Sequence, residues 1–140
     1  MADEAQNIVL LGNQGDPVEF TISTGATIAK GSLMKLSASP QVVALATITS
    51  IFMGIAAEEK TAADGKTKIT LYTHCLADLT CGAAETMVLG APVQMGAASN
   101  EVTVASGDAV AQSALVVGIA QETVGGNGIG TVLINVGKQR

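Results

Sequence analysis

Aromatic side chains are almost absent from this sequence of 140 residues, which contains no tryptophan, one tyrosine and two phenylalanines. Charged residues are also few, at 14%, whereas 48% of the residues are hydrophobic. The core must therefore be built mainly from aliphatic side chains. Low charge combined with a positive mean hydropathy of +0.44 excludes the disordered class. A chain of this length is expected to form one domain with a substantial core.

Basic residues are scarce and scattered. Seven Lys and Arg residues stand against twelve Asp and Glu residues, which gives a net charge of −5. Proteins that bind nucleic acids neutralise phosphates with clustered basic side chains. We therefore expect no nucleic-acid partner.

A long hydrophobic run is also missing. The longest apolar stretch, residues 42–57, is interrupted by Thr47, Thr49 and Ser50, and it is shorter than the ~20 apolar residues that cross a bilayer. Residues 1–6 are acidic and lack the positively charged region of a signal peptide. We expect a soluble protein that is made in the cytoplasm and has no membrane partner.

Side chains that bind metals or act as nucleophiles are few. Cys75 and Cys81 are the only cysteines, and His74 is the only histidine. This set is too small and too widely spaced for a metal site. A local disulfide is geometrically conceivable, but two small strand residues are favoured in a reducing compartment. On a strand, His74 and Cys75 would point to opposite faces, which is unsuitable for proton transfer.

Two other patterns resemble sites but fit structural roles better. Glu58-Glu59 stands beside Lys60 just before a turn, as at a solvated strand end. The glycine-rich residues 125–130 are followed by a β-branched strand, whereas a phosphate-binding loop needs a helix there. A hairpin turn is therefore predicted for them. We expect no enzymatic activity and no cofactor.

What the sequence does contain is a repeated pattern. Residues 52–58 (FMGIAAE) return as residues 116–122 (VVGIAQE), with their glycines 64 positions apart (118 − 54 = 64). Each copy is followed by a turn and an alternating strand. Two copies do not make a solenoid, so the pattern predicts two similar β-units in one domain. The strand after each copy is matched through Ile69, Leu71 and Thr73 with Val132, Ile134 and Val136.

Short β-branched segments separated by turn signals predict strands along the whole chain. Asp64-Gly65 signals a tight hairpin, and only residues 107–113 suit a short helix. We expect an all-β fold, a small β-barrel or β-sandwich built from two similar β-units, with an N-terminal arm and at most one short helix. The expected boundaries are an arm or edge strand at 1–25 and a β-rich domain at 26–140, with repeats at about 27–80 and 86–137.

Across residues 26–137 the chain resembles bacteriophage head decoration proteins, also called capsid cement proteins. The resemblance rests on a glycine-led strand (TIAKGSLM, 27–34), on MGIA (53–56), on GAPV (90–93), and on VGIA (117–120) followed by a glycine turn and TVLINV (131–136). The family normally has an aromatic residue near the second glycine-led strand, where this chain has Met95.

The resemblance implies a β-rich, non-enzymatic virion protein. Such a protein binds the outer surface of the assembled capsid, often as an oligomer, and stabilises the lattice of the major capsid protein. For this chain we expect a homotrimer on the outer capsid surface, made in the host cytoplasm. Two alternatives stay open: another virion structural module, of the tail tube or of a fibre, and a small ligand-binding β-barrel.

Residues 1–25 are the expected arm, and capsid or partner contact is expected there. Ile8 to Leu11 would add to a sheet edge of a partner by β-augmentation. An ordinary strand in the protein's own sheet is an equal alternative for this run. The candidate partner-binding residues are Ile8, Val9, Leu10, Leu11, Val18 and Phe20.

Overall fold

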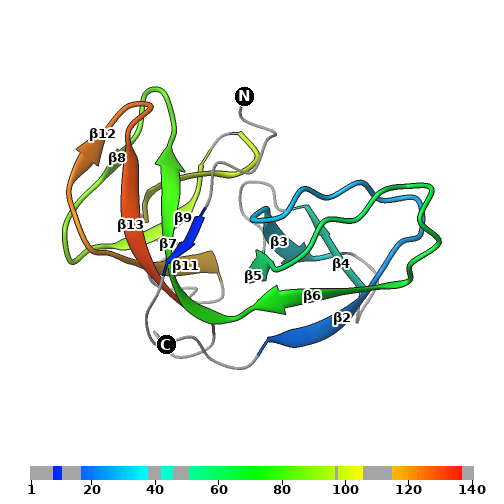
Figure 1. Cartoon of the computed structure of the whole chain (residues 1–140). Coiled ribbons are helices and arrows are strands. Elements are labelled where there is room, and N and C mark those ends of the chain that lie inside the picture. Colours follow the sequence, from blue (N-terminus) through cyan, green and yellow to red (C-terminus); the bar gives the residue numbers. More distant parts are fainter. Residues whose placement is uncertain are drawn as a thin grey trace.

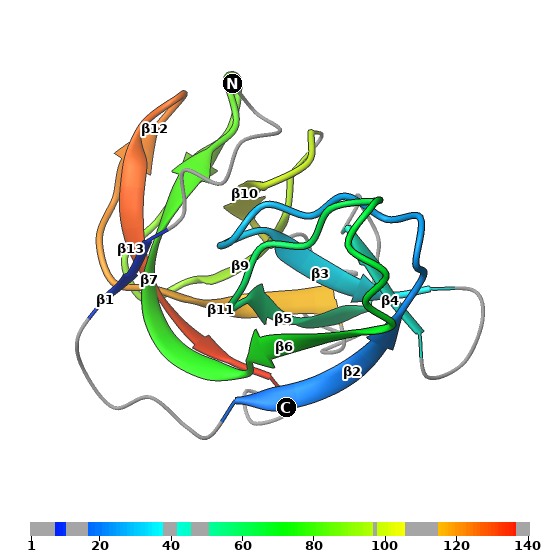
Figure 2. The same ribbon diagram turned by 45° about the vertical axis from the view of Figure 1, so that its right-hand side comes forward.

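The computed structural model describes residues 8–10, 17–37, 42–45, 51–96, 98–105 and 115–136. Within these ranges the chain consists of β-strands and turns, and no α-helix is present. The all-β prediction is confirmed; the expected helix at 107–113 lies outside the described residues. Figure 1 shows the strands in two groups that lie side by side, and Figure 2 shows the same groups from another direction.

The first group, called the first barrel below, is a closed ring of five strands in the order β2-β4-β3-β5-β6. Neighbours in the ring are antiparallel, except that β2 and β4 are parallel. Aliphatic side chains fill its interior. The strands are β2 (Val18–Ile22), β3 (Leu33–Leu36), β4 (Val42–Leu45), β5 (Phe52–Ala56) and β6 (Lys68–Tyr72). The buried cluster is Ile22, Ile28, Met34, Val43, Ala56, Ile69 and Leu71.

The second group, the second barrel, is a ring in the order β7-β10-β9-β11-β13, which the pairing of β13 with β7 closes. Two further strands form a short ladder, and β1 (Ile8–Leu10) pairs antiparallel with β7 outside the ring. The ring strands are β7 (His74–Cys81), β9 (Pro92–Met95), β10 (Glu101–Val104), β11 (Val116–Ala120) and β13 (Ile129–Asn135), and the ladder is β8 (Thr86–Met87) with β12 (Val124–Gly125).

The two barrels have the same topology, strand for strand. In each, the first strand is parallel to the third and antiparallel to the fifth. The registers also match: Ile22 pairs with Val43 as Cys81 pairs with Val102, which is a constant shift (81 − 22 = 59; 102 − 43 = 59). The prediction of two similar β-units is therefore confirmed, and each unit is a closed barrel in its own right.

The repeated glycines lie beside matching β-bulges. In the first barrel the register shifts between Met34 and Lys35, opposite Gly54 and Phe52. In the second barrel it shifts between Val116 and Gly118. A Cβ on Gly54 would lie 2.6 Å from the carbonyl oxygen of Tyr72, and a Cβ on Gly118 would overlap that of Leu133. Glycine is needed because the neighbouring strand backbone passes too close for a side chain.

The last strands match with a different shift from the one expected. Leu71 pairs with Ala56 as Val132 pairs with Ala120, so the shift is 61 (132 − 71 = 61). The sequence comparison matched Leu71 with Ile134, which is a shift of 63 (134 − 71 = 63). That prediction was wrong by two residues, the distance between neighbouring side chains on one face of a strand. The predicted faces survive because strand side chains alternate with a period of two.

The structure also differs from the expected start of the repeat. Val18–Ile22 is not an arm or an edge strand, because β2 lies between β4 and β6 in the first barrel. Its counterpart is Ala77–Cys81 in β7. Asp64-Gly65 lies in the connection from β5 to β6, where Asp64 N–H donates to Thr61 O (3.3 Å), rather than in a two-residue hairpin.

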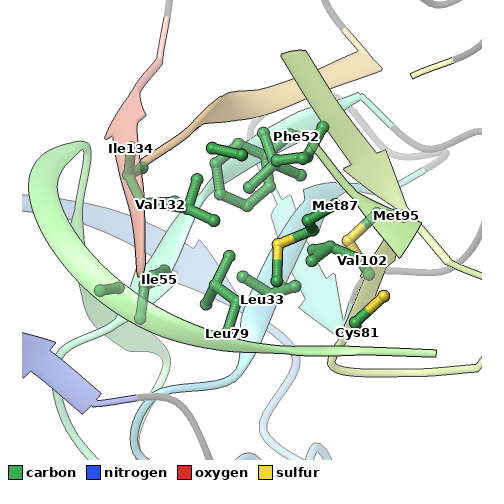
Figure 3. Packing of buried hydrophobic residues seen from close by; sticks show 14 of the residues in the cluster. Leu33, Phe52, Ile55, Leu79, Cys81, Met87, Met95, Val102, Val132 and Ile134 are labelled. Carbon is green, nitrogen blue, oxygen red and sulfur yellow. The ribbon is translucent and has the colours of Figure 1, made fainter. Parts of the chain in front are cut away.

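The two barrels share one core. Leu33, Phe52 and Ile55 belong to the first barrel but pack with the buried residues of the second. Figure 3 shows Phe52 facing Val132 and Met87 from the second barrel. A side-chain hydrogen bond also crosses the junction, from Leu33 N–H to Asn100 Oδ1 (2.9 Å). The barrels are therefore expected to unfold together.

Candidate partner-binding surfaces

The candidate residues of the expected arm do not form one surface. Ile8, Val9 and Leu10 form β1 and stand opposite Asp78, Ala77 and Leu76 of β7. Of the two alternatives, the structure places this run in the protein's own sheet. Leu11 lies outside the described residues.

Val18 and Phe20 lie in the first barrel instead. Val18 is 41% exposed, and Phe20 is half-buried and packs against the first-barrel core. A deletion of residues 1–25 would therefore remove a barrel strand as well as the segment before it. A deletion that tests β1 alone has to end before Pro17.

The edge of β7 that carries β1 is well suited to strand pairing. Cys81 N–H donates to Gly128 O on the β13 side (2.8 Å). Because backbone groups alternate sides along a strand, the N–H and C=O of Leu76 and Asp78 point the other way, toward β1. Ala77, between them, is fully buried.

The matching edge of β2 is different. Ile22 N–H donates to Thr67 O on the β6 side (2.9 Å), so the backbone groups of Glu19 point away from β6. Pro17 takes the place of Leu76 (76 − 59 = 17) and has no N–H. The exposed Glu19 side chain lies 3.8 Å from Lys68 Nζ. On the side of β2 that faces away from β6, no strand among the described residues pairs with Pro17–Glu19, since β4 reaches only Thr21 and Ile22. Proline is a usual means of protecting such an edge, and it is the difference from β7, because Asp78 gives that edge an acid as well.

Three exposed aliphatic side chains were missed by the sequence reasoning. Val88, Leu89 and Ile129 of the second barrel are exposed by 45%, 64% and 52%. Leu89 is at the tip of a turn in which Ala91 N–H donates to Val88 O (2.9 Å) and Gly90 has φ 82°. The first barrel has the same turn, with Ser32 N–H donating to Ala29 O (3.1 Å) and Gly31 at φ 88°.

At the equivalent positions the first barrel has lysine. Lys30 corresponds to Leu89 (89 − 30 = 59) and Lys68 corresponds to Ile129 (129 − 68 = 61), and both lysines are exposed. A signal existed in the sequence, since aligning the two repeats over these turns pairs Lys with Leu and Lys with Ile. Exposed apolar patches are typical of surfaces that a partner covers, so these positions of the second barrel are candidates for partner contact.

The two cysteine thiols are buried and stay protonated over the ordinary pH range. Cys75 is buried and free, and burial raises the pKa of its thiol to about 11. Burial also raises the pKa of Cys81. His74 is half-buried on the other face of β7 and pairs with Asn135 in the β13 register. A nucleophilic cysteine needs a lowered pKa, so neither thiol is activated.

One lysine is buried. Lys60, whose side chain is fully inaccessible, donates through Nζ to Thr24 O (2.8 Å), Thr61 O (3.2 Å) and Ala26 O (3.3 Å) and lies 3.3 Å from Asp64 Oδ1. Its backbone pairs with Ile28 as that of Val124 pairs with Met87. The three carbonyl oxygens and Asp64 satisfy the ammonium, so Lys60 joins the β2–β3 connection to its own β5–β6 connection.

The other patterns have structural explanations. Gly128 N–H donates to Gly125 O (2.9 Å), so the glycine-rich residues form the tight turn between β12 and β13. Glu58 forms an exposed ion pair with Lys66 (3.3 Å). Among the described residues, no three Cys, His, Asp or Glu side chains are grouped as metal ligands would be. The described residues also contain no helix of the length and hydrophobicity required to cross a membrane.

No protein-family model matches this chain, and no curated protein is significantly similar to it.

Proposed function

We propose that the protein is a structural component of a bacteriophage virion that binds the outer surface of the assembled capsid and stabilises the capsid lattice, acting as a homotrimer. The observation that carries the proposal is the divergence of two barrels with one topology. Both keep the same rings and glycine-linked bulges, but the second replaces surface lysines with Leu89 and Ile129. A closely packed body in which one of two similar barrels has gained exposed aliphatic side chains suits a cement protein.

The packing supports the same proposal. Each barrel interior is filled by buried aliphatic side chains, and a ligand-binding barrel would need a cavity with convergent polar groups. The shared core joins the barrels into one body. A body of this kind can transmit load between neighbouring subunits of a shell, and many weak contacts over a lattice give avidity.

The test is binding to purified capsids of the cognate phage, before and after expansion, followed by electron microscopy. We expect protein density on the outer surface of the expanded heads. The double variant Leu89→Lys/Ile129→Lys, which copies the first barrel, should weaken binding while keeping the circular dichroism spectrum. Ile51→Lys, at a first-barrel residue that is 44% exposed, is the matched control and should bind normally.

Two outcomes would contradict the proposal. Labelled protein that decorates tails and leaves expanded heads bare would favour a tail-tube or fibre module. Saturable stabilisation of the isolated protein by one small molecule, without capsid binding, would favour the ligand-binding barrel.

A further inference from the structure

β1 is separable from the rest of the fold. The first ring closes through β2-β4-β3-β5-β6, and the second closes through the pairing of β7 with both β10 and β13. β1 belongs to neither ring and pairs with β7 alone. In Figures 1 and 2 it lies along the outside of β7. It can therefore leave without opening a barrel.

The edge that β1 covers requires a strand. The backbone N–H and C=O groups of Leu76 and Asp78 point away from β13, and the fully buried Ala77 lies between them. Without a partner strand these groups would lose their hydrogen bonds next to buried apolar surface. An uncovered edge of this kind pairs readily with another chain.

The first barrel shows that an uncovered edge can be protected in this architecture. There Pro17 and Glu19 stand where β7 has Leu76 and Asp78 (76 − 17 = 59; 78 − 19 = 59), and no described strand pairs with them on the side of β2 away from β6. Leu76 retains the N–H that Pro17 lacks, so the β7 edge offers one more donor. Both edges carry an acid, Glu19 and Asp78, so the two edges differ through Pro17, which protects the β2 edge by removing a backbone donor.

We propose that the Leu76–Asp78 edge of β7 also accepts Ile8–Leu10 from a second copy of this chain, so that copies are linked by exchange of β1. The inference rests on the homo-oligomer that forms part of the proposed function. Each copy supplies one donor strand and one acceptor edge, so a closed ring of copies keeps every β1–β7 pairing. The exchanged β1 makes the same backbone contacts with β7 of a neighbouring copy as it makes with β7 of its own chain.

The test is disulfide trapping between differently tagged copies. One copy carries Ile8→Cys and the other carries Asp78→Cys, two positions that stand opposite each other in the register. Opposed residues of an antiparallel pair that exchange both hydrogen bonds have Cα atoms about 5.5 Å apart, within the roughly 4.4–6.8 Å that a disulfide needs. Burial and the raised pKa of Cys75 and Cys81 limit the background. The copies are mixed at high concentration, incubated and oxidised mildly.

The matched control pairs Ile8→Cys with Glu19→Cys, the equivalent position on the protected edge of β2. We expect about tenfold more mixed disulfide with Asp78→Cys than with Glu19→Cys, because only the first pair meets the distance requirement. The double variant Ile8→Cys/Asp78→Cys carries both cysteines in one chain. It therefore reports β1–β7 pairing whether β1 comes from the same copy or from another copy. At low concentration it should close within the monomer.

Suppose that the double variant forms its disulfide within one chain, and that the mixed copies yield no more mixed disulfide than the control. Then β1 pairs only with β7 of its own chain, and the proposal is overturned. If neither forms a disulfide, the acceptor edge itself is refuted. Capsid binding is measured separately on the same variants. Formation of the mixed disulfide without capsid binding would contradict the proposed cement function but would support strand exchange.

Discussion

The first and second barrels share every ring pairing but differ in chemistry at equivalent positions. Lys30, Lys60 and Lys68 of the first barrel correspond to Leu89, Val124 and Ile129 of the second (89 − 30 = 59; 124 − 60 = 64; 129 − 68 = 61). Topology survived these replacements because it depends on the strand registers and the bulges. Surface chemistry was free to change, so partner binding is expected to differ between the barrels.

The interiors differ too, and in one pair of positions the changes partly compensate each other. Ile28 and Ile69 fill one end of the first barrel, where the second has Met87 and Gly130 (87 − 28 = 59; 130 − 69 = 61). A Cβ on Gly130 would lie 2.7 Å from Cε of Met87, so the longer side chain occupies the space that the glycine leaves. Met87 thus partly replaces the side chain that is missing at position 130, although Met and Gly together have fewer side-chain atoms than two isoleucines.

Removing the largest side chain at the junction should have the greatest effect. Phe52→Ala should lower the free energy of unfolding by about 3–5 kcal/mol, because it leaves a cavity between the barrels. Phe52 is 1% exposed and packs with the second-barrel cluster. Urea unfolding is followed by circular dichroism and by fluorescence of Tyr72, the only tyrosine.

One cooperative transition is expected with both probes, in the parent and in the variant. The equivalent Val116→Ala removes fewer atoms and should cost less. Two separate unfolding transitions in the parent protein would contradict the conclusion that one core joins the barrels.

The glycines at the two bulges give the next largest effect. Gly118→Ala and Gly54→Ala should each destabilise the protein by about 3 kcal/mol, because the added Cβ meets a strand carbonyl that cannot move freely. Gly25→Ala is the control, since a Cβ there meets nothing within 4 Å. Thermal and urea unfolding measure all three. Equal stability of the bulge variants and the control would show that the bulges do not need glycine.

Replacing the buried Lys60 should lower the free energy of unfolding by less than the glycine replacements do. Lys60→Met should cost about 1–3 kcal/mol, because Thr24, Ala26 and Thr61 lose a charged hydrogen-bond donor. Lys66→Met, which breaks only the exposed pair with Glu58, should cost less than about 1 kcal/mol. Urea midpoints compare the two. A stable Lys60→Met protein would mean that the first barrel accepts an apolar residue as the second does at Val124.

The smallest predicted effect is a pH dependence confined to the first barrel. The pKa of Asp64 lies below its ordinary value of 3.8, chiefly because Lys66 N–H donates to its carboxylate (2.8 Å), with further help from Thr61 N–H and Lys60. A lowered folded-state pKa contributes stability that is complete above the ordinary value and is lost as the pH falls through the folded value.

Carboxyl NMR shifts of Asp64, measured between about pH 5 and pH 2, should give the lowered midpoint. Asp64→Asn should remove this part of the acid dependence of the urea midpoint. An Asp64 midpoint at or above the ordinary value would contradict the hydrogen-bonded arrangement around Lys60.

Sequence patterns located the repeat where local geometry imposes strict demands. Gly54 and Gly118 were found because a close strand approach tolerates only glycine there. The place of β2 in the repeat was missed because VEFTI and ADLTC share one identical residue, Thr21 with Thr80 (80 − 21 = 59). The pattern of apolar residue, acid, apolar residue, threonine and apolar residue was nevertheless common to both. A strand position needs only the correct alternation, which few identities reveal.

The sequence by itself determined the all-β class, the two similar units and the glycines at their bulges, because alternation and close backbone approach are local requirements. Only the tertiary structure decided that each unit closes into its own barrel, that Phe52 packs in the core of the other barrel and that Ile8–Leu10 covers β7. These are pairings between residues far apart in the chain. Any alternating strand can satisfy several such pairings, and the choice depends on which edges and apolar faces remain after the rest has packed.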